Sequence, residues 1–303
     1  MLIERWRDSD LAWLFGRSPR AMLSFGVAAL LVVVSVLAPW LAPQNPFDLA
    51  GLSLLDALKP PAWMEGGDRY FPFGADGQGR DVLSAILYGT RTSLAVGLAA
   101  VALSLVLGIS LGLLAGYLGG FVDAVIMRLA DVQWSFPAIL IALLIDGVAR
   151  TIVSQGQHDR FSLLVLVLAI GLAGWVPFAR TVRATTMVEK SREYVQAARV
   201  TGVRPLRIMV AHILPNTLGP VLVLATIQLA AAIIIEATLS FLGVGVPPTQ
   251  PSLGTLIRVG SSMLMSGEWW VTLFPSLTLA AIVLSINVFG DWLRDALNPK
   301  LRR

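Results

Sequence analysis

Long apolar stretches alternate with short charged segments along this chain. A helix needs about 20 apolar residues to cross the roughly 30 Å hydrocarbon layer of a membrane. Five uncharged stretches are of that order of length, namely 21–42, 92–122, 161–179, 213–235 and 269–290. The pattern therefore predicts at least five membrane-spanning helices.

A sixth stretch, 122–147, is less apolar. Its first half carries Asp123, Arg128 and Asp131, and its second half is the apolar run VQWSFPAILIALLI. Residues three apart lie on the same side of a helix, so we expect Arg128 and Asp131 to form an ion pair.

Positive charge decides whether this sixth stretch counts as a span. Lys and Arg concentrate before residue 21, between 183 and 212, and after 294. Segments rich in these cations favour the cytoplasmic side of a membrane. Six spans place all three segments on one side, whereas five would put 183–212 outside. The sequence therefore predicts an all-α integral membrane protein with six transmembrane helices and both termini in the cytoplasm.

These spans divide the chain into five parts. We expect a cytoplasmic N-terminal segment, a first span, an external loop, a core of five further spans, and a cytoplasmic tail. The external, periplasmic loop contains many turn residues and ends in a short interfacial helix that Asp81 caps. The parts cover 1–20, 21–42, 43–90, 91–293 and 294–303, and the core includes a cytoplasmic loop at 184–216.

Composition supports the membrane assignment and excludes several kinds of chemistry. Of 303 residues, 56% are hydrophobic and 14% charged, and the mean hydropathy is +0.74. The net charge of +4 fits membrane topology better than a nucleic-acid surface. The chain has no Cys and two distant His, which excludes disulfides and gives no metal-ligand spacing. It also lacks a phosphate-binding loop, since no Gly precedes a Lys, so another chain must bind any ATP that is used. The chain is therefore not expected to be an enzyme.

One charged segment, 192–216, lies between two apolar spans and reads REYVQAARVTGVRPLRIMVAHILPN. It favours a helix to Val200, a break at Gly202, and a second helix from Pro205. The second helix has one apolar face, made by Leu206, Met209, Val210 and Ile213. From the residues alone, two interpretations stay open. The segment is either a basic helix lying on anionic lipid headgroups or a docking element for another protein.

The same segment resembles the cytoplasmic EAA loop of ABC importer permeases. That motif is E-A-A, three residues, Gly, nine residues, and I-x-L-P. This chain has Gln196-Ala197-Ala198, Gly202, and then His212-Ile213-Leu214-Pro215 at the same spacing. It departs from the motif at Gln196, which replaces Glu, and at His212, which replaces Ile.

The resemblance extends over nearly the whole chain. Further similar stretches lie at 60–67, 73–94, 112–137, 239–257 and 289–302. They identify the chain as a member of the dipeptide/oligopeptide/nickel permease family, with most similarity to the C-type permease subunit of dipeptide importers. The resemblance implies a type I ABC importer permease fold in a bacterial inner membrane. It also implies that the chain forms half of a translocation pathway for short peptides. Nickel complexes, glutathione or opine-like solutes are alternative substrates.

The resemblance also implies partners. These are a second permease that forms a heterodimer, two cytoplasmic ATPase subunits that bind ATP and Mg²⁺, and an external solute-binding protein. No cofactor is expected in this chain. The EAA loop would couple the ATPase to the membrane helices. Its implied coupling residues are Glu193, Tyr194, Gln196, Ala197, Ala198, Arg199, Gly202, Arg204, Leu206 and His212.

Two polar residues inside apolar spans are candidates for the transport pathway or its gate. Gln228 and Glu236 both lie on the fifth span. Each also has a structural interpretation: an interhelical hydrogen bond for Gln228, and a buried pairing for Glu236. A self-sufficient secondary transporter is a remote alternative, because that class needs its own coupling-ion site. A membrane-embedded enzyme would need a cluster of catalytic groups, and only scattered polar residues are present.

Small and aromatic residues in the spans suggest packing roles. Gly108, Gly112 and Gly116 repeat every four residues, which allows close helix packing either within the chain or against a second permease. Four tryptophans near span ends are expected to anchor the chain at the membrane surface. They are Trp134, Trp175, Trp269 and Trp270.

Overall fold

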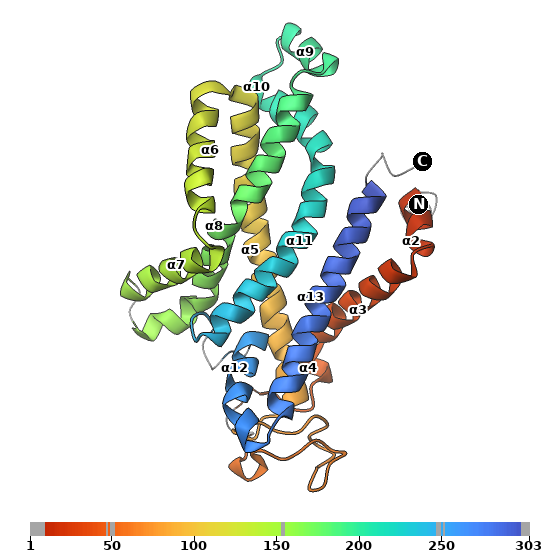
Figure 1. Ribbon diagram of the computed structural model, residues 1–303, viewed down its shortest axis with the longest axis vertical. Coiled ribbons are helices and arrows are strands. Elements are labelled where there is room, and N and C mark those ends of the chain that lie inside the picture. The colour runs from red at the N-terminus through yellow and green to blue at the C-terminus, as the bar shows by residue number, and fades with distance from the viewer. Residues whose placement is uncertain are drawn as a thin grey trace.

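The computed structural model describes residues 10–46, 48, 52–152, 155–246, 250 and 252–297. Throughout these ranges the regular elements are helices (Figure 1). Residues 1–9 of the predicted N-terminal segment and 298–303 of the predicted tail lie outside the described residues. The side chain of His158 lies outside them as well.

The helices follow one another with short connections, except for one long segment between the first and second spans. In chain order they are α2 (Asp10–Gly16), α3 (Pro19–Val36), α4 (Ala38–Leu41), η2 (Leu54–Asp56), α5 (Val82–Leu118), α6 (Gly120–Trp134), α7 (Ala138–Ile152), α8 (Gln155–Glu189), α9 (Glu193–Val200), α10 (Pro205–Arg207), η3 (Ile208–Ile213), α11 (Leu214–Phe241), α12 (Leu253–Met263), η4 (Leu264–Ser266) and α13 (Trp270–Leu297).

Five helical segments are long and apolar enough to cross a membrane. They are α3, α5, the Phe161–Glu189 part of α8, the continuous helix from Pro205 to Phe241, and α13. The sixth predicted span is a bent pair rather than one straight helix, because α6 and α7 meet at 93°. Pro137 lies at this break. Proline has no backbone N–H and disfavours the helical conformation of the residue before it, so the helix ends there.

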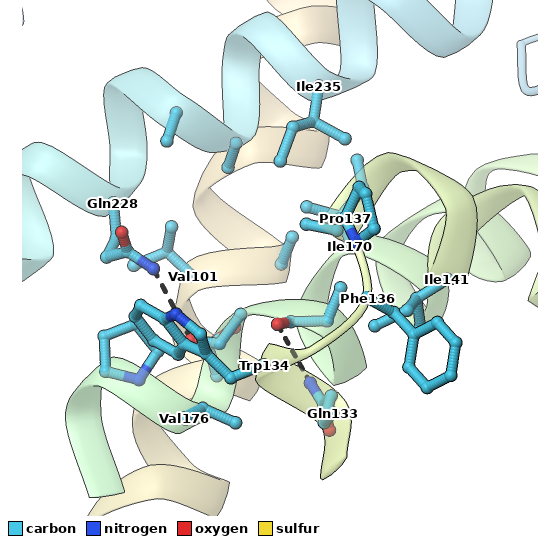
Figure 2. Close-up of a pocket in the computed structure, with 18 residues that line it drawn as sticks. Val101, Gln133, Trp134, Phe136, Pro137, Ile141, Ile170, Val176, Gln228 and Ile235 are labelled. Carbon is cyan, nitrogen blue, oxygen red and sulfur yellow. Dashed lines mark hydrogen bonds between the residues drawn. The ribbon is translucent and has the colours of Figure 1, made fainter. Parts of the chain in front are cut away.

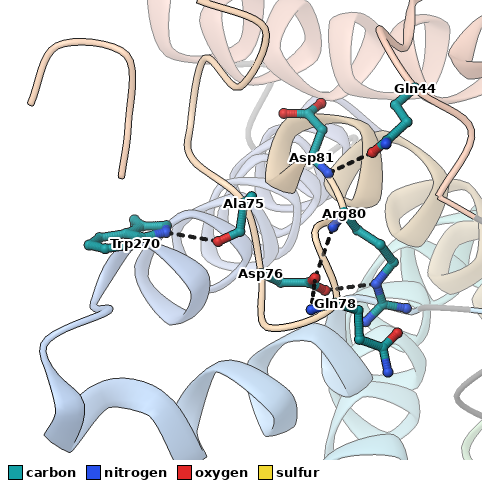
Figure 3. Close-up of polar contacts among 7 residues, drawn as sticks. All are labelled: Gln44, Ala75, Asp76, Gln78, Arg80, Asp81 and Trp270. Carbon is teal, nitrogen blue, oxygen red and sulfur yellow. Dashed lines mark hydrogen bonds and ion pairs between the residues drawn. The ribbon is translucent and has the colours of Figure 1, made fainter. Parts of the chain in front are cut away.

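The second span begins earlier than its apolar run indicates. We expected a separate interfacial helix after Asp81, but α5 is continuous from Val82 to Leu118. Asp81 does cap it: its carboxylate accepts hydrogen bonds from the backbone N–H of Ser84 at 2.7 Å and from the Ser84 hydroxyl at 2.5 Å. Gln44 accepts a hydrogen bond from the Asp81 backbone at 2.9 Å, which fastens the end of the first span to this cap (Figure 3).

The external segment before α5 is irregular but firmly held. Asp76 and Arg80 form a buried ion pair at 2.7 Å, and the Asp76 carboxylate also accepts backbone N–H groups of the same turn (Figure 3). The Trp270 indole N–H donates to the Ala75 carbonyl at 3.2 Å. Trp270 is thus buried within the chain, and its predicted role as a membrane-surface anchor is wrong.

The most extensive helix contact in the core is between α5 and α8, and the glycine stripe lies along it. Gly108, Gly112 and Gly116 all face α8. A Cβ on Gly112 would lie 2.6 Å from the Ala179 carbonyl oxygen. The stripe is therefore a seam within the chain, because only hydrogen atoms fit between these two backbones.

Two carboxylates, one near each end of α6, bind α8 instead of pairing along their own helix. The Asp123 carboxylate accepts two hydrogen bonds from the Arg183 guanidinium, one from Nε and one, at 2.6 Å, from Nη2. The Asp131 carboxylate forms an ion pair with Arg180 at 2.7 Å. The expected pair of Arg128 with Asp131 is thus wrong. Because α6 lies beside α8, a cross-helix partner is within reach of Asp131 and fastens the two helices together.

The seam gives a direct test of the core. Gly112→Leu is expected to lower the free energy of unfolding of the detergent-solubilised protein by about 1–3 kcal/mol, because the added side chain overpacks the α5–α8 contact. Gly26→Leu on α3 is the matched control. A Cβ there meets no described atom within 4 Å, so its unfolding temperature should stay near that of the wild type. Equal shifts for the two variants would contradict the seam.

Candidate functional site: a surface loop and a central cavity

The charged segment forms a loop that extends beyond the ends of α5, α6 and α8 (Figure 1). It consists of α9, a turn at Thr201 and Gly202, and α10, as the sequence predicts. Gly202 has φ of +77°, a left-handed conformation that glycine adopts without strain. Pro205 starts α10 at a position where its missing N–H costs nothing.

One face of α9 is buried against the rest of the chain. Val195 is fully buried and Ala198 nearly so, and both belong to the cluster that holds Ile208 and Ile213. Tyr117 at the end of α5 is in the same cluster. Burial of these side chains fixes the loop to the membrane helices, because separating them would expose apolar surface to water.

Two cations strengthen this attachment to α5. The Lys190 ammonium donates to the Tyr117 carbonyl at 2.6 Å, where the helix leaves its last carbonyls without partners. The Arg199 guanidinium lies 5.0 Å from the centre of the Tyr117 ring. Arg199 therefore turns inward and packs against α5.

Tyr194 joins three elements through its hydroxyl. It donates to the Glu189 carboxylate at 2.6 Å and accepts from the Asn216 amide at 2.9 Å. The Asn216 amide also donates to the His212 carbonyl at 3.0 Å. Burial and the neighbouring Glu189 raise the pKa of Tyr194 above its usual range, so the phenol remains a proton donor at neutral pH. The end of α8, α9 and the start of α11 are thus tied together.

The loop continues into the fifth span without interruption. The segment η3 is π-helical, and the Leu214 N–H bonds to the Met209 carbonyl five residues back. Wide turns of this kind are rare and often lie at functional sites. As a result, α10, η3 and α11 form one continuous helix from Pro205 to Phe241.

The opposite face of the loop is exposed and partly apolar. Val200 is 89% exposed and Leu206 is 68% exposed, and Arg204 and Arg207 flank them. A shallow groove beside Val200 is lined by Gly202, Arg204, Leu206 and Arg207, among others. Of the ten predicted coupling residues, those with exposed side chains or backbone on this loop are Glu193, Tyr194, Gln196, Ala197, Gly202, Arg204 and Leu206. Ala198 is buried, and Arg199 and His212 are half-buried.

A cavity of about 380 Å³ lies between α5, the α6–α7 break, α8 and α11 (Figure 2). Apolar side chains form most of its wall, including Trp134, Phe136 and Pro137. The polar side chains lining it are Ser104, Gln133 and Gln228. Among the residues that the structure describes, its wall contains no ionised side chain.

The polar side chains of the cavity donate hydrogen bonds to backbone carbonyls near a proline in α8. Pro177 has no N–H to give to the Ala173 carbonyl. Gln133 supplies that donor, with its amide nitrogen 3.0 Å from the Ala173 oxygen and 2.8 Å from the Leu172 oxygen. The Gln133 oxygen accepts from the Trp175 indole at 2.7 Å. Trp175 is therefore buried, and its expected role as a surface anchor is wrong.

The two candidate pathway residues have different surroundings. Gln228 lines the cavity, and its amide nitrogen is 3.5 Å from the Gly174 carbonyl. Glu236 lies further along α11, is fully buried and does not line the cavity. Its carboxylate accepts a hydrogen bond from the Ser240 hydroxyl, one turn further along the same helix, at 2.8 Å.

Comparison with known families identifies the chain. Residues 108–303 match the family described as "Binding-protein-dependent transport system inner membrane component". Residues 6–61 match the "N-terminal TM domain of oligopeptide transport permease C". The chain belongs to this family of transport permeases. It is a family of membrane components rather than of enzymes, and the predicted resemblance and inner-membrane localisation are confirmed.

Similar proteins extend over almost the full chain. The di/tripeptide transport system permease protein DppC of Pseudomonas aeruginosa is 41% identical, over 90% of this chain and 86% of that protein. The dipeptide transport system permease protein DppC of Haemophilus influenzae is 39% identical, over 96% and 94% respectively. Its namesake in Escherichia coli K12 is also 39% identical, over 95% and 92%.

Solved structures confirm the fold class. Two inward-facing crystal forms of the MetNI methionine ABC transporter contain a chain of similar fold. The TM-scores are 0.56 and 0.55 at 19% and 21% identity. The similarity covers 71% of this chain and 96% or 97% of those chains. This chain thus has the predicted all-α permease fold.

Sequence reasoning missed part of both sites. Ser104, Gln133 and Gln228 all line the cavity, but the sequence marks only Gln228 as a candidate pathway residue. Ser104 and Gln133 lie among small or polar residues, where they do not stand out. The available signal was a glutamine four residues before Pro137 in an apolar run. Tyr117 and Asn216, which hold the loop, lie outside or at the edge of the motif and carry no signal of their own.

Proposed function

We propose that this chain is a permease subunit of an ATP-driven importer and forms half of the pathway for short peptides. The observation that carries the proposal is the loop formed by α9, the Gly202 turn and α10. Its tip is exposed and apolar, and its base is buried against the membrane helices. Such a tip gains free energy when a partner covers it. Membership of the permease family supports an ATPase subunit as that partner.

Contact with the ATPase falls to the exposed face. Val200 and Leu206 supply its apolar centre, and Arg204 and Arg207 supply a cationic rim. An apolar centre within a charged rim is the usual organisation of a protein interface. Glu193, Gln196, Ala197 and Gly202 border it, whereas Tyr194, Ala198, Arg199 and His212 hold the base. ATP and Mg²⁺ are bound, and ATP hydrolysed, in the partner.

The loop transmits motion because it is continuous with two helices of the cavity. It follows α8 through the Tyr194–Glu189 bond and runs into α11 through η3. A shift of the loop therefore moves two cavity walls. ATP binding closes the ATPase pair and moves the loops, which opens the pathway toward an external binding protein. Hydrolysis resets it.

Charge supports a cytoplasmic position for the loop. The start of α3 and the end of α13 lie toward the same end of the molecule as the loop (Figure 1). Phe15 and Trp292, near these two ends, are 5.2 Å apart in an edge-to-face contact. The described cations of the two terminal segments, Arg17, Arg20 and Arg294, support a common side with the loop, which the positive-inside rule would assign to the cytoplasm. A second, unlike permease completes the pathway.

Relatives support short peptides as the cargo. The three relatives described above are named for di- or tripeptide transport. Nickel complexes, glutathione and opine-like solutes remain the alternative cargo for the same architecture. Among the described residues, no group of three or more His, Cys, Asp or Glu side chains is placed to hold a metal ion.

Uptake into proteoliposomes tests this function. Vesicles that contain the chain, its partner permease and both ATPase subunits should accumulate a labelled dipeptide when the binding protein and ATP are supplied on their respective sides. Omission of ATP should abolish accumulation. Accumulation without the ATPase subunits would instead indicate a self-sufficient transporter, and uptake of nickel or glutathione but no dipeptide would replace the cargo.

Gly202→Trp tests the coupling role of the loop. Gly202 borders the exposed groove, and a large side chain there would separate the docking surfaces, so ATP-dependent uptake should fall about tenfold or more. The protein should still reach the membrane. Gly120→Trp is the matched control. Gly120 also has a positive φ, of +54° compared with +77° at Gly202. At both positions an added Cβ would have no described atom within 4 Å. Normal uptake by Gly202→Trp would remove the docking role.

A further inference from the structure

The central cavity has the size of a ligand site. Its volume of about 380 Å³ falls in the range of roughly 300–1,000 Å³ that small-molecule pockets occupy. The 93° bend between α6 and α7 opens its wall, since the chain turns away at Phe136 and Pro137 instead of filling the space. Figure 2 shows Gln133 of α6 and Gln228 of α11 both directed toward α8.

The chemistry of the wall matches a peptide group. A peptide group is neutral, has one donor and one acceptor, and is flanked by side chains of any kind. A glutamine amide also donates and accepts, so it pairs with a peptide group whichever way the cargo runs. The charge-free wall does not trap either end of a zwitterionic peptide. A transport step needs this, because the cargo must also leave.

The two glutamines are not equally free to do this. Gln133 makes three contacts at 2.7–3.0 Å and replaces the donor that Pro177 lacks. Its release would leave the part-buried Ala173 carbonyl without a donor, which is unfavourable. Gln228 makes its contact with Gly174 at 3.5 Å, the limit of a hydrogen bond. Gln228 is thus the amide that exchanges its partner at little cost.

We propose that Gln228 hydrogen-bonds the peptide group of the cargo as it passes through this cavity, and that Gln133 is a positioning residue that keeps α8 in place. The inference rests on the proposed function and assigns a site within the pathway. Gln228 lies on α11, which continues into the loop. The same motion that the ATPase drives therefore moves the contact with the cargo.

A comparison of two cargos in the wild type and three variants isolates this contact. The cargos are a labelled dipeptide, Ala-Ala, and its analogue with an N-methylated peptide bond, which lacks the N–H donor. Uptake is measured at saturating cargo in the proteoliposomes that contain the full complex. The binding protein is the same in every arm, so its own preference between the two cargos enters every uptake ratio equally and cancels when a variant's ratio is divided by that of the wild type.

The wild type should take up Ala-Ala about fivefold faster than the methylated analogue, the effect of one hydrogen bond. Gln228→Met should bring the two rates together while ATPase activity stimulated by the binding protein persists. Gln133→Met should slow both cargos alike and leave their ratio unchanged. Gln228→Asn keeps the amide on a shorter stem and should restore part of the preference.

A preference that survives in Gln228→Met, or a Gln133→Met variant that loses it, would overturn the assignment. If Gln228→Met fails to assemble, the ratio in Gln228→Asn decides: an unchanged ratio overturns the proposal and a reduced one supports it. Failure of the proposed function has a different signature. In that case the wild-type complex takes up neither peptide, while a non-peptide cargo accumulates with ATP.

Discussion

The structure depends on the close contact of α5 with α8. Three glycines of α5 remove the side chains that would separate these helices, so that backbone and Cβ atoms of α8 lie directly against them. Lipid offers no hydrophobic gain for bringing two apolar helices together, so van der Waals packing at such a seam has to supply the attraction. The seam then positions everything at its ends. The loop rests on Tyr117 where α5 ends, and the cavity lies where α6 bends away from the pair.

A second consequence follows from the need to satisfy every backbone group in lipid. Pro177 leaves a carbonyl of α8 without its helical donor, and a glutamine from α6 fills the gap. This fastens α6 to α8 beside the cavity, and Asp131–Arg180 and Asp123–Arg183 fasten them nearer the loop. Helices that line the cavity are therefore joined to the helices that carry the loop, and we expect a displacement of the loop to reach the cavity as a movement of whole helices.

Several of these features are readable in the sequence and others are not. Apolar length marked the spans, and the Gly202 turn was predicted because glycine and proline act locally on the backbone. Pairings between helices were not predictable in this way. Asp131 was assigned to Arg128 on its own helix, yet it lies within reach of Arg180, 49 residues away. Asp81 was correctly read as a cap, but the helix it starts runs on into the span because nothing local interrupts it. The cavity needed the direction of the bend at Pro137, which sequence spacing does not contain.

Cross-linking from Thr201 tests the account most directly. The chain has no cysteine, so Thr201→Cys places a single photoreactive probe on the exposed tip of the loop, and Met265→Cys, 95% exposed near the start of α13, serves as the control. After activation in native membranes and gentle solubilisation, mass spectrometry identifies the linked protein. The account predicts an ATPase subunit joined to the Thr201 probe and not to the Met265 probe. Recovery of the chain with lipid alone, or labelling of Thr201→Cys from outside intact cells, would contradict it.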